Sequence, residues 1–220
     1  MEAEIKDRPA FAHVVVTLSP GESITAEADA MATMAAELEM ETRLNGGFFS
    51  ALAKRMFGRE PMFINSFANN TMQEKEIMFS QGIPGDIMSM ELNGNSFCLQ
   101  PGAYLCSTPG VKLGLKWAGF KSWISREGLC KLEVSGNGTV WYGAYGGMVE
   151  KQVEGEYIVD TSHLVGYDPS LSFNIQLAGG FFSSLFGGEG LVTRLEGTGT
   201  AIIQTRSLSG LAGWLNPKLR

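Results

Sequence analysis

The sequence predicts an all-β protein, a sandwich or barrel built from short strands and tight turns. Short runs rich in β-branched or aromatic residues occur throughout the chain, each bounded by Gly, Pro, Asn or Ser. Glycine occurs 28 times in 220 residues, without a collagen period, as expected where many turns are tight. Three short motifs also recur in the same order. These three observations predict many short strands within a repeated plan.

The predicted strands follow one another at short intervals. Clear examples are 12–18, 96–100, 130–134, 139–145, 156–160 and 200–205. Helical patterns are limited to residues 50–57 and 207–215. Residues 28–41 are rich in helix formers, but their place in the repeat favours strand, because tertiary context commonly overrides propensity.

Three signatures that recur in a fixed order indicate internal duplication. The first is a turn glycine that leads into a strand, at 19–24, 100–105 and 153–158. The second is a Gly-Phe-x-Ser corner, at 47–50, 119–122 and 180–183. The third is shared by 127–141 and 189–203, with 58–71 as a diverged copy. The corner follows the turn glycine by 26, 17 and 25 residues, so the middle copy is interpreted as shortened.

The repeats predict one compact body of stacked β units. They span approximately 12–71, 96–145 and 148–206, with 72–95 as a connection and 207–220 as a C-terminal tail. A unit of roughly 50 residues buries too little apolar surface to be stable alone. The units must therefore stack on one another or on other chains, and we expect an oligomer.

Composition and charge exclude several classes of protein. A net charge of −6 argues against a protein whose main activity is non-specific nucleic-acid binding. Cys98, Cys106 and Cys130 form no C-x-x-C pair, which favours buried thiols in a reducing compartment. The acidic N-terminal stretch is unlike a signal peptide, and no apolar run has the roughly 18 residues needed to span a bilayer. We expect a cytoplasmic protein that is able to contact a membrane surface.

Catalytic and metal-binding patterns are weak. His13 and His163 are the only histidines, and neither has the H-x-H partner typical of a metal site in cupin-like proteins. Asp160, Ser162 and Asp168 lie near His163, but Asp and Ser at strand ends more commonly cap turns than catalyse reactions. No nucleophile elbow, phosphate loop or H-E-x-x-H motif occurs. We expect a protein that is not an enzyme and needs no metal or cofactor.

The corners that contain Gly-Gly-Phe-Phe-Ser are the candidate contact surface. Its residues are Phe48, Phe49, Phe181, Phe182, Arg43, Lys54, Arg55 and Arg59. Aromatic and basic residues together are able to dock on anionic lipid. The favoured interpretation is that the phenylalanines close the ends of the sandwiches or line a subunit interface. The middle copy has Lys121 at the second aromatic position, so the fold does not require that aromatic.

Several ordered motifs resemble one known family. They are LSPGESI, METRLNGGFFSALAKRMFGRE, IPGDI, PGAYL, EGLCKLEVSGNGTVW, EGEYIVDTSHLVGY and GGEGLVTRLEGTGTAIIQTR. Together they resemble the bacterial and archaeal family related to the mitochondrial-biogenesis protein altered inheritance of mitochondria twenty-four, from about Leu18 to Arg206. Residues 58–61 depart from the family pattern, and Asn69 and Asn70 replace the first Gly-x-Gly.

The resemblance implies a double-stranded β-helix of the kind seen in the tryptophan RNA-binding attenuation protein, assembled as a homotrimer. It implies no enzymatic reaction, and the fold analogy does not transfer RNA binding. We therefore expect a non-enzymatic oligomeric β-sandwich protein that acts as a scaffold or binding module, with itself as main partner. The alternatives are a peripheral membrane protein on an anionic surface, or a binder of a small ligand or RNA between subunits.

Overall fold

The chain folds as an all-β protein throughout the part that the structure describes, which confirms the predicted class. The structure is a computed structural model that describes residues 1–44, 63–100, 102–117, 130–177 and 191–219. Within these ranges the paired strands are antiparallel, and the α-helix present is a short one near the C-terminus. No helix among the described residues is long and apolar enough to cross a membrane.

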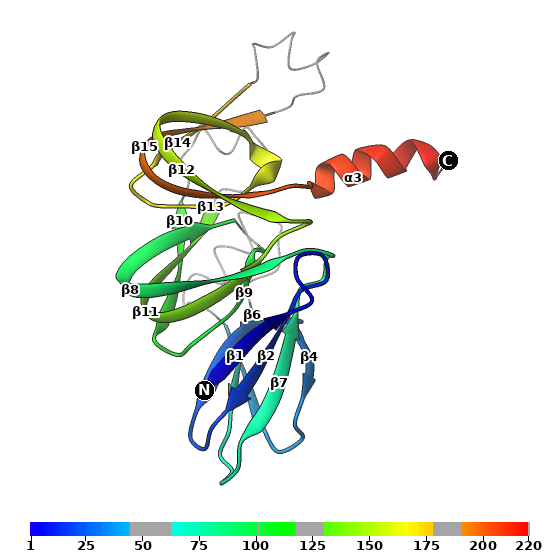
Figure 1. Cartoon of the computed structure of the whole chain (residues 1–220), viewed down its shortest axis with the longest axis vertical. Helices are drawn as coiled ribbons and strands as arrows, with labels where there is room; N and C mark the ends of the chain where they lie inside the picture. The colour runs from blue at the N-terminus through cyan, green and yellow to red at the C-terminus, as the bar shows by residue number, and fades with distance from the viewer. Residues whose placement is uncertain (45–62, 101, 118–129, 178–190, 220) are drawn as a thin grey trace.

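The strands form three parts that follow one another along the sequence and along the long axis in Figure 1. The first part contains β1 (Glu2–Lys6), β2 (His13–Leu18), β3 (Ser23–Glu27), β4 (Met31–Met34), β5 (Glu39–Leu44), β6 (Phe63–Ala68) and β7 (Lys75–Ser80). The middle part contains β8 (Ile87–Leu99), β9 (Tyr104–Ser107), β10 (Val111–Trp117) and β11 (Cys130–Gly143). The third part contains β12 (Met148–Asp160), β13 (Leu164–Tyr167), β14 (Ser172–Leu177) and β15 (Leu191–Gln204).

The first part has short strands with a clear alternation. In β2, the sequence HVVVTL buries Val14, Val16 and Leu18 and turns the residues between them outward. β2 pairs with β1 and β7, and β7 also pairs with β4, which makes one sheet. β3 and β5 pair with β6 in the second sheet.

The middle and third parts are organised around long strands. β8 pairs with β11 along most of its length, and β10 pairs with β11 on the other edge. β12 pairs with β15 from Met148↔Gln204 to Asp160↔Val192, and β14 pairs with the same strand. The short strands β9 and β13 pair with the ends of β11 and β15.

Two short backbone joints connect the parts. β9 pairs with β3 through Thr25↔Ser107 and Ala26↔Cys106, which joins the middle part to the first. β13 pairs with β8 through Gly166↔Leu99 and Tyr167↔Cys98, which joins the third part to the middle. Both joints belong to the second sheet, so this sheet runs through all three parts.

Three hydrophobic clusters lie in the described part of the chain, and each includes residues from two neighbouring parts. The first contains Phe67 and Phe79, whose rings meet edge to face with centroids 5.5 Å apart. The second is centred on Tyr104 and Tyr142. The third includes Tyr167, whose ring stacks on Phe173 at 5.3 Å. The first cluster also contains Ile87, Leu105 and Trp141 of the middle part, and the second contains Val165 and Ile202 of the third, so apolar packing connects the parts as well as the backbone joints.

Several sequence predictions can be compared with these elements. The strand interpretation of residues 28–41 is confirmed for 31–34 and 39–41, which form β4 and the start of β5, and turns occupy the residues between and before them. The predicted C-terminal helix is confirmed as α3 (Leu208–Leu215). The helix predicted at 50–57 lies outside the described residues. Residues 72–95, predicted as a connection, contain β7 and more than half of β8.

The turn glycines occupy two different kinds of position. Gly102 lies in the turn before β9, whereas Gly155 lies in the middle of β12 and pairs with Gly197. The corresponding position in the middle of β8 is Gly94. Gly94 and Gly155 have φ of +82° and +89°, and Gly21 between β2 and β3 has +82°. Gly94 and Gly155 thus both lie within long strands with positive φ, whereas Gly102 lies in a turn.

Candidate functional site

The residues predicted as a contact surface fall almost entirely outside the described residues. Seven of them are in this position: Phe48, Phe49, Lys54, Arg55, Arg59, Phe181 and Phe182. Arg43 lies in β5, where its backbone pairs with Ile64, and its side chain is not described. Lipid contact and subunit contact at these corners both stay predictions.

The acidic residues near His163 cap turns, as the sequence predicted. Asp160 accepts hydrogen bonds from the backbone N–H and the hydroxyl of Ser162, at 2.8 and 2.7 Å, at the start of the 3-10 turn Thr161–His163. Asp168 accepts a hydrogen bond from the backbone N–H of Ser170 at 2.8 Å. His163 Nδ1 lies 2.7 Å from the carbonyl oxygen of Gln204. These contacts hold strand ends together.

The thiols and histidines form no cluster among the described residues. Cys98 and Cys106 are buried and form no disulfide among the described residues, and burial raises the pKa of Cys106 well above its usual value. His13 Nδ1 lies 3.4 Å from the carboxylate of Asp7. His13 belongs to β2 in the first part, whereas His163 lies in the third part. No group of three or more His, Cys, Asp or Glu able to hold a metal occurs within the described ranges.

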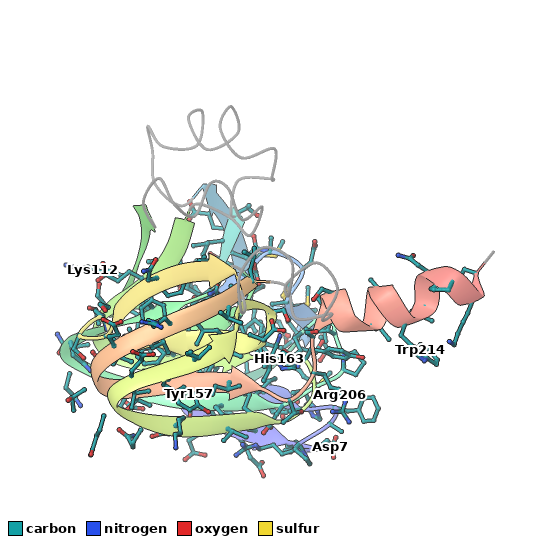
Figure 2. All side chains as sticks on the ribbon, turned by 90° about the horizontal axis from the view of Figure 1, so that it is seen from above. Asp7, Lys112, Tyr157, His163, Arg206 and Trp214 are labelled. Atoms are coloured by element: carbon teal, nitrogen blue, oxygen red, sulfur yellow. The ribbon has the colours of Figure 1, made fainter. Side chains whose placement is uncertain are left out.

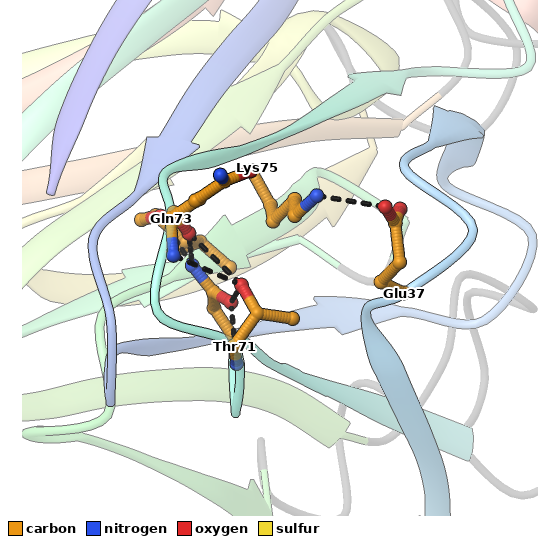
Figure 3. Close-up of polar contacts among 6 residues, drawn as sticks. Glu37, Thr71, Gln73 and Lys75 are labelled. Carbon is orange, nitrogen blue, oxygen red and sulfur yellow. Dashed lines mark hydrogen bonds and ion pairs between the residues drawn. The ribbon is translucent and has the colours of Figure 1, made fainter.

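A buried asparagine links neighbouring segments of the first part. Asn69 lies between β6 and β7 and is fully buried. Its side-chain amide donates to the carbonyl oxygens of Leu18 and Gln73, both at 2.8 Å. Its side-chain oxygen accepts from the backbone N–H and hydroxyl of Thr71. Figure 3 shows Thr71 and Gln73 beside the ion pair between Lys75 and Glu37, which measures 2.8 Å.

The C-terminal helix α3 is apolar and has no buried residue. Its N-cap is Ser207, whose hydroxyl accepts a hydrogen bond from the N–H of Gly210 at 3.1 Å. Trp214 is 59% exposed and Leu208 51% exposed. The ammonium of Lys218 lies 4.5 Å from the centre of the Trp214 ring. Figures 1 and 2 show α3, with Trp214 on it, extending away from the sheets.

A cavity of about 350 Å³ opens where the three parts meet, at the base of α3. The first part contributes the loop after β3 and the segment after β7. The middle and third parts contribute the starts of β9 and β13 and the ends of β11 and β15. Leu208 of α3 completes the lining. The lining segments are 27–30, 80–83, 102–105, 143–144 and 164–165, with Gln100, Gln204 and Leu208.

Glu27 is the acidic group with the largest change of pKa at this cavity. Burial, with a smaller contribution from the nearby carboxylate of Asp29, raises the pKa of Glu27 to about 7. No described residue donates a hydrogen bond to the Glu27 carboxyl or forms an ion pair with it. Asp29 follows in the same loop with φ of +68°, a backbone conformation that Asp tolerates in tight turns.

The other polar side chains around the cavity are mostly engaged. The hydroxyl of Tyr104 lies 2.9 Å from the hydroxyl of Ser107 and donates to the carbonyl oxygen of Thr25 at 3.1 Å. Gln81 donates to the carbonyl oxygen of Ala144 at 3.1 Å.

The side chain of Gln204 connects two further segments beside the cavity. It donates to the carbonyl oxygen of Ser162 at 2.8 Å and accepts from the N–H of Tyr145 at 2.9 Å. These bonds fix the strand ends that surround the cavity.

The sequence did not point to this cavity or to Glu27. Glu27 ends a short strand, and nothing in its local pattern separates it from a solvated glutamate. The cavity is formed by residues between 27 and 208, so its position depends on the two joints. The small residues before β9 and at the end of β11, Gly102, Ala103, Gly143 and Ala144, are a weak local signal, because small residues leave space at a junction.

Comparisons with known proteins agree over nearly the whole chain. A family model described as mitochondrial biogenesis AIM24 matches residues 3–206. An uncharacterised protein of Streptococcus pyogenes serotype M6 is 25% identical over 214 residues, which cover 93% of this chain and 86% of that protein. A crystal structure of a Streptococcus pyogenes protein, 25% identical, superimposes with a TM-score of 0.80 over 99% of both chains.

Proposed function

The chain belongs to the mitochondrial biogenesis AIM24 family, and from this premise we propose that it is a non-enzymatic β protein that assembles with copies of itself into a homotrimer. Its role in the cell is then that of a scaffold or binding module. The observation that carries the proposal is the apolar helix α3, which has no buried residue within its own chain. A helix of this kind requires a partner surface.

The stability of α3 supports the need for a partner. Helices shorter than roughly 12–15 residues are marginal in water even when their residues favour helix. α3 has eight residues, and Gly210 and Gly213 lower its intrinsic helix stability further. The hydrogen bond to Ser207 stabilises only the first turn. Most of the stability of such a helix therefore comes from tertiary or quaternary packing of its apolar residues.

The charge distribution favours a second copy of this chain as that partner. Residues 205–220 contain three basic residues and no acidic one, whereas the whole chain has a net charge of −6. The remaining residues therefore carry −9, and the body of a neighbouring copy attracts the tail. A helix of one copy on the body of the next is a head-to-tail contact, which forms a ring when the rotation closes. A ring of three agrees with the trimer that the family resemblance implies.

The strand pairings support the finer proposal that the body is a repeated, double-stranded β-helix. In each part a long strand pair is flanked by one further strand: β5 beside β6, β10 beside β11, and β14 beside β15. A short strand pairs near the far end in each case: β4 with β7, β9 with β11, and β13 with β15. In the first part, β2 and β3 take the place of the first long strand, and β6 and β7 take the place of the second.

Light scattering after size exclusion tests the assembly. We expect the wild-type chain at micromolar concentration to elute at three times its 23.8 kDa mass. Replacing Trp214 with Asp places a charge in the apolar surface of α3, and we expect this variant to dissociate to monomers. Met72→Asp is the matched control, because Met72 is 90% exposed in the turn between β6 and β7.

The outcomes show separately whether the chain forms a trimer and whether α3 makes the contact between subunits. A wild-type chain that is monomeric at micromolar concentration overturns the proposal. A trimer that persists in Trp214→Asp keeps the assembly but removes α3 as its contact, and directs attention to the predicted corners. Near-native thermal stability of both variants is the check that the β body remains folded.

A further inference from the structure

The cavity at the base of α3 combines apolar walls with a carboxyl group that has no partner among the described residues. Ala30, Leu105, Val165 and Leu208 contribute apolar surface. Glu27 lines the same cavity, is half-buried, and makes no hydrogen bond or ion pair with any described residue. A partly desolvated carboxylate of this kind is unfavourable unless a donor or a positive charge approaches it.

No described lining residue supplies that positive charge. The titratable groups of the described lining are Glu27 at the end of β3, Asp29 in the following loop and Tyr104 on β9, with no Lys, Arg or His among these described residues. The hydroxyl of Tyr104 already bonds to Ser107 and Thr25. His163 precedes the lining residue Leu164, but its Nδ1 contacts the carbonyl of Gln204. The described lining therefore carries two carboxyl groups and no basic side chain.

We propose that this cavity binds a small organic cation, an ammonium group carried on an apolar body, with Glu27 as its counter-ion. The apolar walls suit the body of such a molecule, and its ammonium supplies both the donor and the charge that the carboxylate lacks. A hard metal ion fits less well. Calcium needs about six to eight oxygen ligands, and the side chains of the lining offer two carboxylates.

Binding is then linked to a proton on Glu27. Because the pKa of Glu27 in the empty cavity is about 7, the carboxyl is largely neutral at pH 6 and largely ionised at pH 8. An ammonium ion favours the ionised form and lowers this pKa, so binding releases protons when it occurs near neutral pH. The expected affinity rises about tenfold from pH 6 to pH 8, in proportion to the ionised fraction of Glu27.

Isothermal titration of the full chain with benzylamine tests the proposal, with benzyl alcohol as the neutral analogue of the same shape. We expect saturable binding of benzylamine, at least about tenfold tighter than that of benzyl alcohol. Glu27→Gln removes the charge and keeps the shape, and we expect it to weaken benzylamine binding about tenfold and to abolish the pH dependence. Glu74→Gln is the matched control, since Glu74 is exposed and remote from the lining.

A second variant guards against a folding defect in Glu27→Gln. Ala28→Leu enlarges a lining side chain, leaves Glu27 in place, and is expected to weaken benzylamine binding by occluding the cavity. Equal benzylamine affinity in wild type and Glu27→Gln overturns the proposal, as does benzyl alcohol binding as tightly as benzylamine. Calcium binding without amine binding overturns it as well. The light-scattering result is measured separately, so failure of amine binding leaves the proposed assembly standing.

Discussion

Individual buried polar residues form side-chain hydrogen bonds that connect segments of this protein where strands end. Asn69 satisfies two carbonyl oxygens and one backbone N–H at the break between β6 and β7. Asp86 is buried at the start of β8, where its carboxylate accepts from Arg8 Nε at 2.7 Å and Nη2 at 2.8 Å. The sequence identified Asn69 as a departure from the family pattern but assigned no role to Asp86. A local pattern shows that a residue is unusual, whereas its partner, 78 residues away in the case of Arg8 and Asp86, is set by the fold.

Replacing Asn69 with Ala is expected to lower the free energy of unfolding by about 2–3 kcal/mol, because buried backbone groups lose their partners. Chemical denaturation measures the change. The matched control is Asn70→Ala, since Asn70 is exposed and bonds only to the exposed carboxylate of Glu39. Its expected effect is within about 0.5 kcal/mol. Similar losses in both variants would show that the buried amide network contributes no special stability.

At the scale of elements, strand existence was predictable and strand extent was not. Residues 156–160 and 200–205 were identified as short strands, and the structure extends them into β12 and β15, with 13 and 14 residues. Gly155 and Gly197 read as turn residues, yet they pair with each other inside these strands and have positive φ. With Gly94 in place of Gly102, the corner glycine follows Gly21, Gly94 and Gly155 by 26, 25 and 25 residues. The shortening interpreted for the middle copy therefore depends on which of its two glycines is compared.

The joint between β13 and β8 depends on the small size of Gly166. A Cβ atom at this position would lie 2.8 Å from the backbone oxygen of Cys98 and 2.7 Å from the ring of Phe97. Gly166→Ala is therefore expected to destabilise the protein by about 1–3 kcal/mol through overpacking.

Thermal unfolding of Gly166→Ala against Gly82→Ala measures this effect. A Cβ at Gly82 has no atom within 4 Å, so this control tests the loss of glycine flexibility alone. If the two variants melt together, the close approach of β13 to β8 is not required for stability.

At the scale of the whole molecule, composition, strand-like runs and ordered motifs predicted an all-β chain, and the family match extends over the same region. The way in which the parts meet was not predictable. The two joints involve backbone groups, whose pairing leaves little trace in side-chain pattern, and the cavity they create has no signature in the sequence. The Gly-Gly-Phe-Phe-Ser corners were predictable as a recurring motif, but not as a surface or an interface.

Vesicle flotation tests the predicted role of the corners as membrane contacts. If the corners dock on lipid, the wild-type chain floats with vesicles that contain phosphatidylserine, and the double variant Phe48→Ser/Phe181→Ser floats several-fold less. Met72→Ser serves as the control for loss of one exposed apolar side chain elsewhere. Equal flotation of the wild type and the double variant removes the membrane interpretation and leaves closure of the sandwich ends or subunit contact as the role of these phenylalanines.

The two joints have a consequence for how such a protein is able to change over generations. Each joint is made of two residue pairs held through the backbone, and both have the same form, a short strand laid on an earlier longer one. Backbone hydrogen bonds place few demands on which side chains are present. The side chains at the joints are therefore free to drift in sequence, provided that small residues such as Gly166 persist where two backbones approach closely. The architecture is thus inherited more faithfully than the residues that fill it.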